Sequence, residues 1–534
     1  MTEGAVHRAR RTVAAVAGLP RRPVAGTVAL LLLSTAGMAG IVAVLGTPVP
    51  RVYDEFAYLL SADTFAGGRL TNPTHVHWRH FETFEVIHRP SYQAKYPPAQ
   101  GLLLAAGLVL GHPVVGVWIS VLLMVVATAW ALRSLLRPEW AFAATLLLVL
   151  QLGIASYWAQ SYWGGAVAAA GGGLAFGTAA RLIARRATWW DGCLGGLGLA
   201  LLANSRPLEG LVLAAALAAW IGFAALRWRL PSGLLVRTLA PGLMVAGAGL
   251  MFTAIYNHAV TGSYTTMPYT VHERTYALAP FLIFMQQPAP SQDYLHGEIE
   301  RQHRTRGLER HERLRDEGPW AVIRRAPRLA WTIGGGGMLL LAFLALAWSR
   351  AGTKFATGAF GLLALTVLLT PAAHPHYLAP GVAPLYFLFG VTASSLGAKA
   401  RSRSATLTNL IMAMVVLVAL VQVGVQARQK FDQQGDWADQ RTWTLEALRA
   451  EPQRDLVFVH YPTEYGRRVE WVYNRADIDA AEVVWARPIS ADADLALVEY
   501  FETRRVWDLE ISENGERIGI KERTRPALAR KALP

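Results

Sequence analysis

Residues 21–56 read RRPVAGTVALLLLSTAGMAGIVAVLGTPVPRVYDEF. The apolar run at 24–46 is long enough to cross about 30 Å of hydrocarbon as a helix. It is too long for the core of a signal peptide, and no A-x-A cleavage site follows it. We therefore predict a retained membrane anchor, with basic residues before it and the acidic pair Asp54-Glu55 directly after it.

Similar apolar runs recur along the whole chain. Further spans are predicted near 113–136, 140–156, 164–183, 190–204, 208–226, 238–256, 328–349, 355–372, 377–398 and 405–425. Apolar residues make up 53% of the 534 residues and charged residues only 16%, which excludes an ordinary set of soluble domains. The single Cys193 excludes an internal disulfide and a cysteine zinc cluster. The predicted fold class is an all-α polytopic membrane protein of about eleven spans.

The segment 98–111 is the ambiguous part of this count. Pro97-Pro98 precedes it and His112-Pro113 follows it, so it is short for a full crossing. If it does not cross, every connection rich in Arg or Lys falls on one side of the membrane. We predict a re-entrant or surface-lying helix.

The positive charge sets the orientation. Arg and Lys gather in alternate connections, whose only acids are Glu3, Glu139 and Asp191. The cations of those connections are Arg8, Arg10, Arg11, Arg21, Arg22, Arg133, Arg137, Arg181, Arg185, Arg186, Arg227, Arg229, Arg237, Arg350, Lys354, Lys399, Arg401 and Arg403. By the positive-inside rule, these loops and the N-terminus are cytoplasmic. The net charge of +14 is therefore an orientation signal and predicts no nucleic-acid partner.

The domain organisation follows from this orientation. We predict a cytoplasmic tail at 1–23 and a transmembrane domain at 24–425 with outer loops at 47–97 and 257–327. Residues 426–534 are predicted to form an extracytoplasmic α/β domain. Its strand-like runs lie at 455–461, 483–487 and 506–511. The predicted location is a bacterial-type inner membrane.

No Asp, Glu, Lys or Arg lies in the middle of any span, which argues against an ion-coupled transporter. Polar residues gather at the outer boundary instead. Asp54 and Glu55 there could supply a general base or bind a divalent cation. Asp54 could equally cap a helix that runs to Gly67-Gly68, and the two roles are compatible.

The first outer loop also carries His75, His77, His80, Glu82, Glu85 and His88. Three histidines within six residues and two acids could bind Mg²⁺, Mn²⁺ or Zn²⁺, or contact an acceptor. The spacing is not that of a fixed helical site, so a polar loop with interfacial histidines explains them as well. His374 and His376, before another span, are further candidates for such contacts.

Two cations could bind a lipid phosphate. Lys95 stands before Pro97-Pro98, and Arg206 lies in the turn Asn204-Ser205-Arg206-Pro207. Either could contact phosphate, or serve only to anchor the chain at the interface. The turn with Tyr157, Trp158, Tyr162 and Trp163 is either an interfacial aromatic belt or an aromatic wall of a binding site.

An acidic pair after the first span, followed by Lys95 and Pro97-Pro98 before an apolar helix, resembles the GT-C superfamily of membrane glycosyltransferases. The nearest groups are the protein O-mannosyltransferases, the aminoarabinose (lipid A) transferases and the RgtA/B/C/D-like domain. The resemblance covers mainly residues 24–210. It implies a polyprenyl-phosphate sugar as donor, a catalytic carboxylate at Asp54 with Glu55 beside it, and a phosphate contact at Lys95.

Two departures from the family pattern stand out. Tyr96 separates Lys95 from the prolines, and the outer turn 156–164 lacks the second acid that related enzymes often carry. Either Glu82 or Glu85 substitutes for that acid, or the site works with fewer acids. The resemblance thus leaves metal dependence open.

The predicted activity is transfer of a hexose or pentose to an acceptor hydroxyl at the outer face. Asp54 would take the proton of the hydroxyl, while Lys95 and Arg206 stabilise the leaving phosphate. One direct displacement would invert the anomeric configuration. The acceptor, whether glycan, lipid or protein, stays open. A flippase for lipid-linked glycans and a non-catalytic scaffold are the alternatives, and convergence of the outer turns around Asp54 would favour the enzyme.

Overall fold

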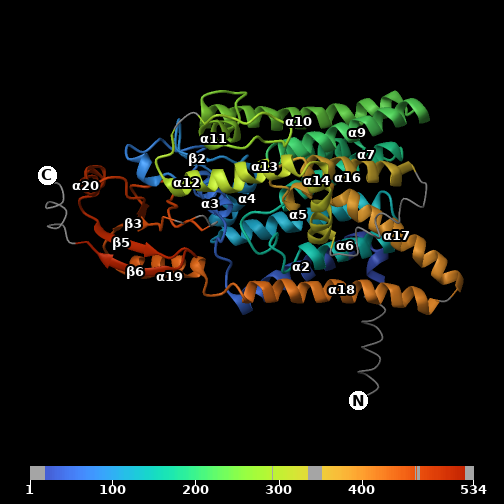
Figure 1. Ribbon diagram of the computed structural model, residues 1–534. Coiled ribbons are helices and arrows are strands. Elements are labelled where there is room, and N and C mark those ends of the chain that lie inside the picture. The colour runs from blue at the N-terminus through green and yellow to red at the C-terminus, as the bar shows by residue number, and fades with distance from the viewer. Residues whose placement is uncertain are drawn as a thin grey trace, which may run out of the picture.

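The computed structural model describes residues 18–290, 293–334, 351–403, 405–463, 465 and 469–523. A bundle of long helices occupies one end of the molecule, and a small sheet with its helices occupies the other (Figure 1). In this view α10 runs along the top of the bundle and α18 along the bottom.

Most bundle helices lie where apolar runs predicted them, whereas α14 begins at Pro319, within the loop predicted at 257–327. They are α2 (Pro23–Leu45), α5 (Pro113–Arg133), α6 (Pro138–Leu152), α7 (Ala166–Ile183), α8 (Trp189–Ala203), α9 (Pro207–Trp228), α10 (Ser232–Thr261), α14 (Pro319–Gly334), α16 (Ala351–Leu368), α17 (Val382–Arg403) and α18 (Ala405–Phe431). The span predicted at 328–349 lies outside the described residues beyond 334.

Within the described part of the chain, six helical segments are long and apolar enough to cross a membrane. They are α2, α5, α7, α9, α10 and Pro375–Ala398, which joins the 3-10 turn η5 (Pro375–Gly381) to α17. Large apolar side chains on the outside of α10, such as Leu243 and Met244, are exposed, as expected for a surface that faces lipid. The chain is a multi-pass membrane protein, and the count of eleven crossings stays a prediction.

The segment at 98–111 forms the short helix α4 (Ala99–Val109), which packs between α3 (Tyr53–Ala66) and α5. Gly107 and Gly116 let α4 and α5 approach closely, since a Cβ added to Gly116 would lie 2.1 Å from the Leu103 carbonyl oxygen. Close packing of this kind holds α4 in place at the base of the first loop.

Glycines also set the contact between α8 and α10. A Cβ on Gly192 would lie 2.0 Å from the carbonyl oxygen of Thr238, and one on Gly196 would lie 2.2 Å from that of Gly242. These neighbours are backbone atoms of the facing helix, so only small residues permit the observed helix separation.

We expect Gly196→Leu to lower the free energy of unfolding by about 1–3 kcal/mol, because the leucine side chain must push α10 away from α8. The readout is the thermal unfolding midpoint of the purified protein in detergent. Gly247→Leu on α10 is the matched control, since a Cβ there meets nothing within 4 Å. Equal midpoints for the two variants would show that the glycine contact is not needed.

Residues after α18 form a four-stranded sheet. The strands are β3 (Asp455–His460), β4 (Val483–Ala486), β5 (Arg505–Ile511) and β6 (Arg517–Glu522), in the order β4-β3-β5-β6. β3 is parallel to β4 and β5, whereas β6 is antiparallel to β5. The helix α20 (Ala491–Tyr500) connects β4 to β5, and α19 (Trp437–Arg449) precedes β3.

This sheet and the first loop, residues 47–97, share one hydrophobic core. Phe56 and Leu60 of α3 and Phe81 of the loop belong to the same buried cluster as Phe458 of β3 and Trp485 of β4. The ring of Phe56 stacks on Tyr473 with centroids 4.5 Å apart. The position of α3 is thus fixed from outside the bundle as well as from within it.

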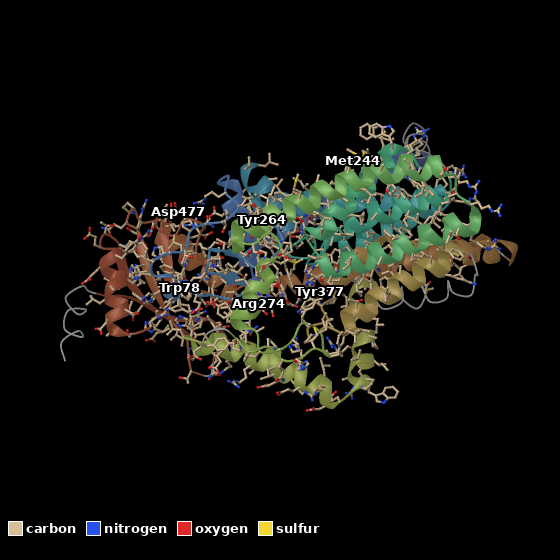
Figure 2. The ribbon with its side chains drawn as sticks, turned by 90° about the horizontal axis from the view of Figure 1, so that it is seen from above. Trp78, Met244, Tyr264, Arg274, Tyr377 and Asp477 are labelled. Atoms are coloured by element: carbon tan, nitrogen blue, oxygen red, sulfur yellow. The ribbon has the colours of Figure 1, made fainter. Side chains whose placement is uncertain are left out.

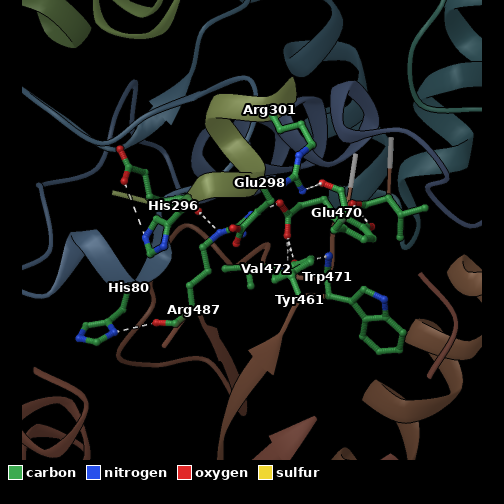
Figure 3. Close-up of polar contacts among 12 residues, drawn as sticks. His80, His296, Glu298, Arg301, Tyr461, Glu470, Trp471, Val472 and Arg487 are labelled. Carbon is green, nitrogen blue, oxygen red and sulfur yellow. Dashed lines mark hydrogen bonds and ion pairs between the residues drawn. The ribbon is translucent and has the colours of Figure 1, made fainter. Parts of the chain in front are cut away.

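A buried ion network ties the same parts together (Figure 3). Arg487, which is fully buried, pairs with Glu298 of α12 (Gly297–Gln302) and with Glu470. Its Nε also donates to the carbonyl oxygen of Glu82 in the first loop, at 2.8 Å. A single guanidinium thus joins the first loop, the long loop at 257–327 and the C-terminal sheet.

Candidate active site

Asp54 lies in the first turn of α3, where the positive end of the helix dipole favours a negative charge. The N-cap position belongs to Val52, which gives no side-chain cap, so the cap predicted at Asp54 is not formed. The Asp54 carboxylate instead accepts a hydrogen bond from the Tyr96 hydroxyl. Burial raises the pKa of Asp54 to about 6, and the negative charge of Glu85 raises it in the same direction. A carboxylate with such a pKa suits a general base near neutral pH.

The Tyr96 hydroxyl joins two carboxylates, because it also contacts Glu85 Oε2 at 2.9 Å. Tyr96, which separates Lys95 from the prolines and so departs from the pattern of the related enzymes, therefore connects Asp54 to a second acid, Glu85. The sequence left Glu82 and Glu85 as candidates for that acid. Glu82 instead accepts a hydrogen bond from Tyr276, at 2.6 Å.

Lys95 lies between two carboxylates. Its Nζ is 2.5 Å from Glu85 and 3.2 Å from Glu273 of α11 (Pro268–Tyr276), and it lies 4.7 Å from the centre of the Tyr269 ring. Burial alone would raise the pKa of Glu273, but the charge of Lys95, the hydrogen bond to His272 and the charges of His272 and His303 together outweigh burial and lower that pKa to about 2. Lys95 is thus a paired cation within an acidic cluster.

Arg206 offers a different kind of cation. Its guanidinium carbon lies 4.5 Å from the centre of the Tyr377 ring, a cation–π contact. No carboxylate among the residues that the structure describes lies within 4.0 Å of its nitrogens, although the charge of Glu209, three residues farther along, acts on Arg206. Its N–H groups are therefore the better suited of the two predicted cations to bind an anionic ligand.

These groups converge, although they come from distant parts of the chain. Tyr58 of α3 stacks on Tyr96 with ring centroids 4.5 Å apart. Burial raises the pKa of Tyr58, the charge of Arg206 opposes that rise, and Asp54 adds to it. Tyr377 is within electrostatic reach of Asp54, Lys95 and Arg206. Figure 2 shows Tyr377 near the middle of the molecule, at the end of the bundle that faces the loops and the sheet.

Glu55 has other surroundings. Its two carboxylate oxygens accept hydrogen bonds from the backbone N–H groups of Arg51 (3.0 Å) and Tyr162 (2.9 Å). Burial raises the pKa of Glu55 to about 7, against the effect of these two hydrogen bonds. Glu55 also lines a cavity of about 1410 Å³, whereas Asp54 is not among the lining residues. The two carboxylates of the predicted pair therefore have different surroundings: Asp54 contacts Tyr96, and Glu55 faces the cavity.

The predicted histidine contacts separate into distant groups. His75 bonds Asp479 of the C-terminal domain at 3.0 Å, and His77 lies beside the Tyr500 ring. His374 and His376 stack on each other next to Trp163. In the described part of the chain, no group of three or more His, Cys, Asp or Glu residues is arranged to hold a metal ion.

The aromatic residues of the turn at 157–163 lie partly in the hydrophobic core and partly at the cavity. Trp158 is buried in the hydrophobic core of the bundle, so it is not part of a wall. Tyr157, Tyr162 and Trp163 line the cavity. The Tyr162 hydroxyl also donates to the Pro48 carbonyl oxygen at 2.6 Å.

Sequence reasoning missed Glu273 and undervalued Tyr96. The signal at Glu273 is weak, because one acid in a long loop rich in charge has no distinguishing spacing. In the sequence, Tyr96 is only an interruption between Lys95 and the prolines. The signal that it does carry is its hydroxyl, a hydrogen-bond donor placed directly between a cation and an apolar helix.

The fold and these residues describe a polytopic membrane protein with a polar cluster at the ends of its helices. No family model and no curated protein sequence matches the chain. Among solved structures, ArnT from Cupriavidus metallidurans bound to undecaprenyl phosphate is similar, with a TM-score of 0.54 and 12% identity over 91% of this chain and 92% of ArnT. The apo form of ArnT is similar with a TM-score of 0.50 and 13% identity over 90% of this chain and 93% of ArnT.

An oligosaccharyltransferase from Archaeoglobus fulgidus is similar at a TM-score of 0.45 and 12% identity, covering 91% of this chain and 69% of that one. ArnT is an aminoarabinose transferase of the GT-C superfamily. The likeness to ArnT shows that the chain has the GT-C fold, which confirms the resemblance predicted from the acidic pair and the Lys95 segment.

Proposed function

We propose that this protein is a membrane glycosyltransferase that moves a sugar from a polyprenyl-phosphate donor to an acceptor hydroxyl at the outer face of the membrane. The observation that carries the proposal is Asp54, a buried carboxylate with a pKa near 6 that shares one cluster with Lys95, Arg206 and Tyr377. ArnT, which has this fold, binds undecaprenyl phosphate. The convergence of the first loop with the turns at 204–207 and 371–377 favours an enzyme over a scaffold.

The proposed reaction is one direct displacement. Asp54 takes the proton of the acceptor hydroxyl while the hydroxyl oxygen attacks the anomeric carbon. The bond between that carbon and the phosphate oxygen breaks, and the polyprenyl phosphate leaves with both electrons of the bond. The configuration of a hexose or pentose would invert, because attack and departure take place on opposite faces of the sugar.

Arg206 is proposed to hold the donor phosphate. Its guanidinium can form two hydrogen bonds to phosphate and so stabilise the charge that develops on the leaving group. Lys95 contributes positive charge to the same region, but its carboxylate partners Glu85 and Glu273 offset that charge. Its proposed role is to hold the acidic cluster together and to contact the phosphate secondarily.

The proposed location is a bacterial-type inner membrane with a cytoplasmic N-terminus. The basic connections would then face the cytoplasm. The first loop, the long loop at 257–327 and the C-terminal α/β domain would face outward. The candidate site would lie at the outer membrane boundary, where a lipid-linked donor presents its phosphate.

The direct test uses the purified protein in lipid nanodiscs with polyprenyl phosphates that carry different radiolabelled sugars. The acceptors are envelope components from a strain that lacks the protein. We expect one donor to give labelled product at a rate at least ten times that of protein-free nanodiscs. No transfer from any donor, with intact folded protein, would refute the proposed function.

A chelator arm of this assay tests the predicted divalent cation. Glu85, which shares the Tyr96 hydroxyl with Asp54, and Glu273 already share the Lys95 ammonium, so a cation there would have to displace it. We expect transfer in EDTA to stay within twofold of the rate in Mg²⁺. A loss that Mg²⁺, Mn²⁺ or Zn²⁺ reverses would establish the metal that the sequence left open.

The pH profile provides a further prediction. Asp54 must be deprotonated to act as a base, so kcat/KM should rise with pH through about 6 and fall about tenfold per pH unit below that value. In Glu85→Gln, one negative neighbour is gone and the pKa of Asp54 should drop. The rising limb of the profile should then move to lower pH. A limb that does not move would show that another group titrates.

A further inference from the structure

The cavity of about 1410 Å³ lies between the bundle and the C-terminal domain. Its wall is built from the ends of α2 and α18, from α3, from the turn at 156–163, and from α19 with its neighbouring loops. The size exceeds that of a typical pocket for a drug-sized ligand, about 300–1,000 Å³. None of the roles assigned above uses this space.

The helix α3 separates the cavity from the Asp54 cluster. Glu55, Leu59 and Asp63 line the cavity and follow one face of the helix, since residues four apart share a face. Asp54 and Tyr58, also four apart, lie on the neighbouring face, about 100° round the helix from Glu55 and Leu59, and contact Tyr96. Arg51 and Val52 line the cavity too, so it reaches the N-terminal turn that carries Asp54.

The wall is rich in amide and aromatic groups. The amides belong to Gln160, Gln426, Gln429, Gln433, Gln434 and Asn474, and the large aromatics are Tyr157, Tyr162, Trp163, Trp443, Tyr473 and Trp485. Four of these amides, in Gln160, Gln426, Gln434 and Asn474, already donate to backbone carbonyl oxygens, whereas the amide oxygen of Gln426 is buried without a hydrogen-bond partner in the described part of the chain. An amide with a free donor or acceptor matches a hydroxyl group. Flat aromatic faces suit the C–H face of a sugar ring. Such a wall fits a ligand with many hydroxyl groups.

The cations of this wall all have oxygen partners. Arg51 pairs with Asp439 at 3.1 Å, Arg475 with Asp63 at 2.8 Å, and Arg449 with Glu482 at 2.8 Å. Lys430 donates to the carbonyl oxygen of Gln160 at 2.6 Å. Arg441 donates to backbone carbonyl oxygens, at 3.0 and 3.1 Å.

A phosphate in this cavity would have to compete with those partners, whereas a neutral ligand would not. The available cation, Arg206, lies on the other side of α3, within reach of Tyr58. The charge distribution therefore assigns the anionic donor to the Asp54 side and a neutral ligand to the cavity.

We propose that this cavity binds the acceptor, and that the acceptor is a neutral glycan whose reacting hydroxyl points toward the N-terminal turn of α3. The inference rests on the proposed glycosyltransferase function and names the class of its acceptor. Sugar units farther from the reacting hydroxyl lie against the glutamines of α18 and against Trp443 of α19. The C-terminal domain thereby forms one wall of the acceptor site.

The test labels single cysteines with a maleimide in the full-length protein in nanodiscs, with Cys193, the only natural cysteine, changed to serine. Gln429→Cys reports on the exposed cavity wall. Met267→Cys reports on the pocket beside Lys95. Glu513→Cys, at the exposed turn between β5 and β6, is the matched control.

Two probes are used. One is the neutral oligosaccharide fraction released by mild acid from envelopes of a strain lacking the protein, at millimolar concentration, and the other is undecaprenyl phosphate. We expect the neutral fraction to slow labelling of Gln429→Cys at least fivefold. Undecaprenyl phosphate should slow labelling of Met267→Cys only. Neither probe should affect Glu513→Cys.

Protection of Gln429→Cys by undecaprenyl phosphate or by the anionic fraction, but not by the neutral fraction, would overturn the inference. So would unchanged transfer after Gln429→Cys has been fully modified by a bulky maleimide, where we expect at least a tenfold loss. If the wild-type protein binds the neutral fraction but transfers no sugar, the proposed function fails and the binding site stands. If it transfers sugar and shows no protection, only the inference fails.

Discussion

Replacing Asp54 with asparagine should lower the rate of sugar transfer by about 100- to 10,000-fold, the range expected for loss of a general base. Asparagine has nearly the same shape, and its side-chain oxygen can still accept the hydrogen bond from Tyr96. The substitution thus removes basicity and negative charge while it leaves the local packing intact. Transfer in nanodiscs at saturating donor is the measurement.

Asp492→Asn provides the matched control for this variant. Asp492 is exposed and lies in the first turn of α20, the helix that connects β4 to β5. Membrane insertion and thermal unfolding are compared for both variants. Transfer by Asp54→Asn near the wild-type rate would remove Asp54 from the catalytic role, and Glu55 would then be the next carboxylate to test.

Arg206→Gln should reduce transfer by about 100- to 1,000-fold, the loss typical of removing one preorganised group that stabilises developing charge. Glutamine keeps a hydrogen-bond donor but loses both the charge and the paired geometry that suit phosphate. Arg206→Lys should recover only part of the activity, because an ammonium restores the charge without the fork of donors. The measurement is kcat/KM for the donor.

The control is Arg237→Gln, an exposed arginine on α10 in a connection predicted to be cytoplasmic. It should transfer sugar at the wild-type rate. Lys95→Gln would be a poorer test of phosphate binding, because it leaves the carboxylates of Glu85 and Glu273 unpaired. An unchanged kcat/KM in Arg206→Gln would assign the donor phosphate to another group.

The positions of the bundle helices were predictable because a bilayer imposes a length and an apolar composition on every crossing segment. The apolar run at 24–46 appears as α2, Pro23–Leu45, and the proline-bounded segment at 98–111 appears as the short α4, Ala99–Val109. The Asp54 region was found for a related reason. Acids directly after an apolar span are unusual enough to be noticed without knowledge of the fold.

The histidines of the first loop show what local spacing can and cannot predict. His75, His77 and His80 do lie together, with ring centroids 6.0 Å apart for His75 and His77 and 6.2 Å apart for His77 and His80. Their polar partners come from a distant part of the chain, because His75 contacts Asp479 and His80 contacts the carbonyl oxygen of Arg487. Periodicity predicts a shared face only in a helix or strand, so it could not predict these partners.

The amino-acid sequence by itself determined the class of the protein, the helix positions, the predicted orientation and the first acid of the site, because bilayer thickness and charge asymmetry act on short stretches of chain. Only the tertiary structure decided which side chains contact one another in the candidate site. Tyr96 joins Asp54 to Glu85, Lys95 lies between Glu85 and Glu273, and Arg206 is left available. It also gave Asp54 and Glu55 different surroundings, with Asp54 bonded to Tyr96 and Glu55 facing the cavity. These relations depend on how distant segments pack, and no local pattern records that packing.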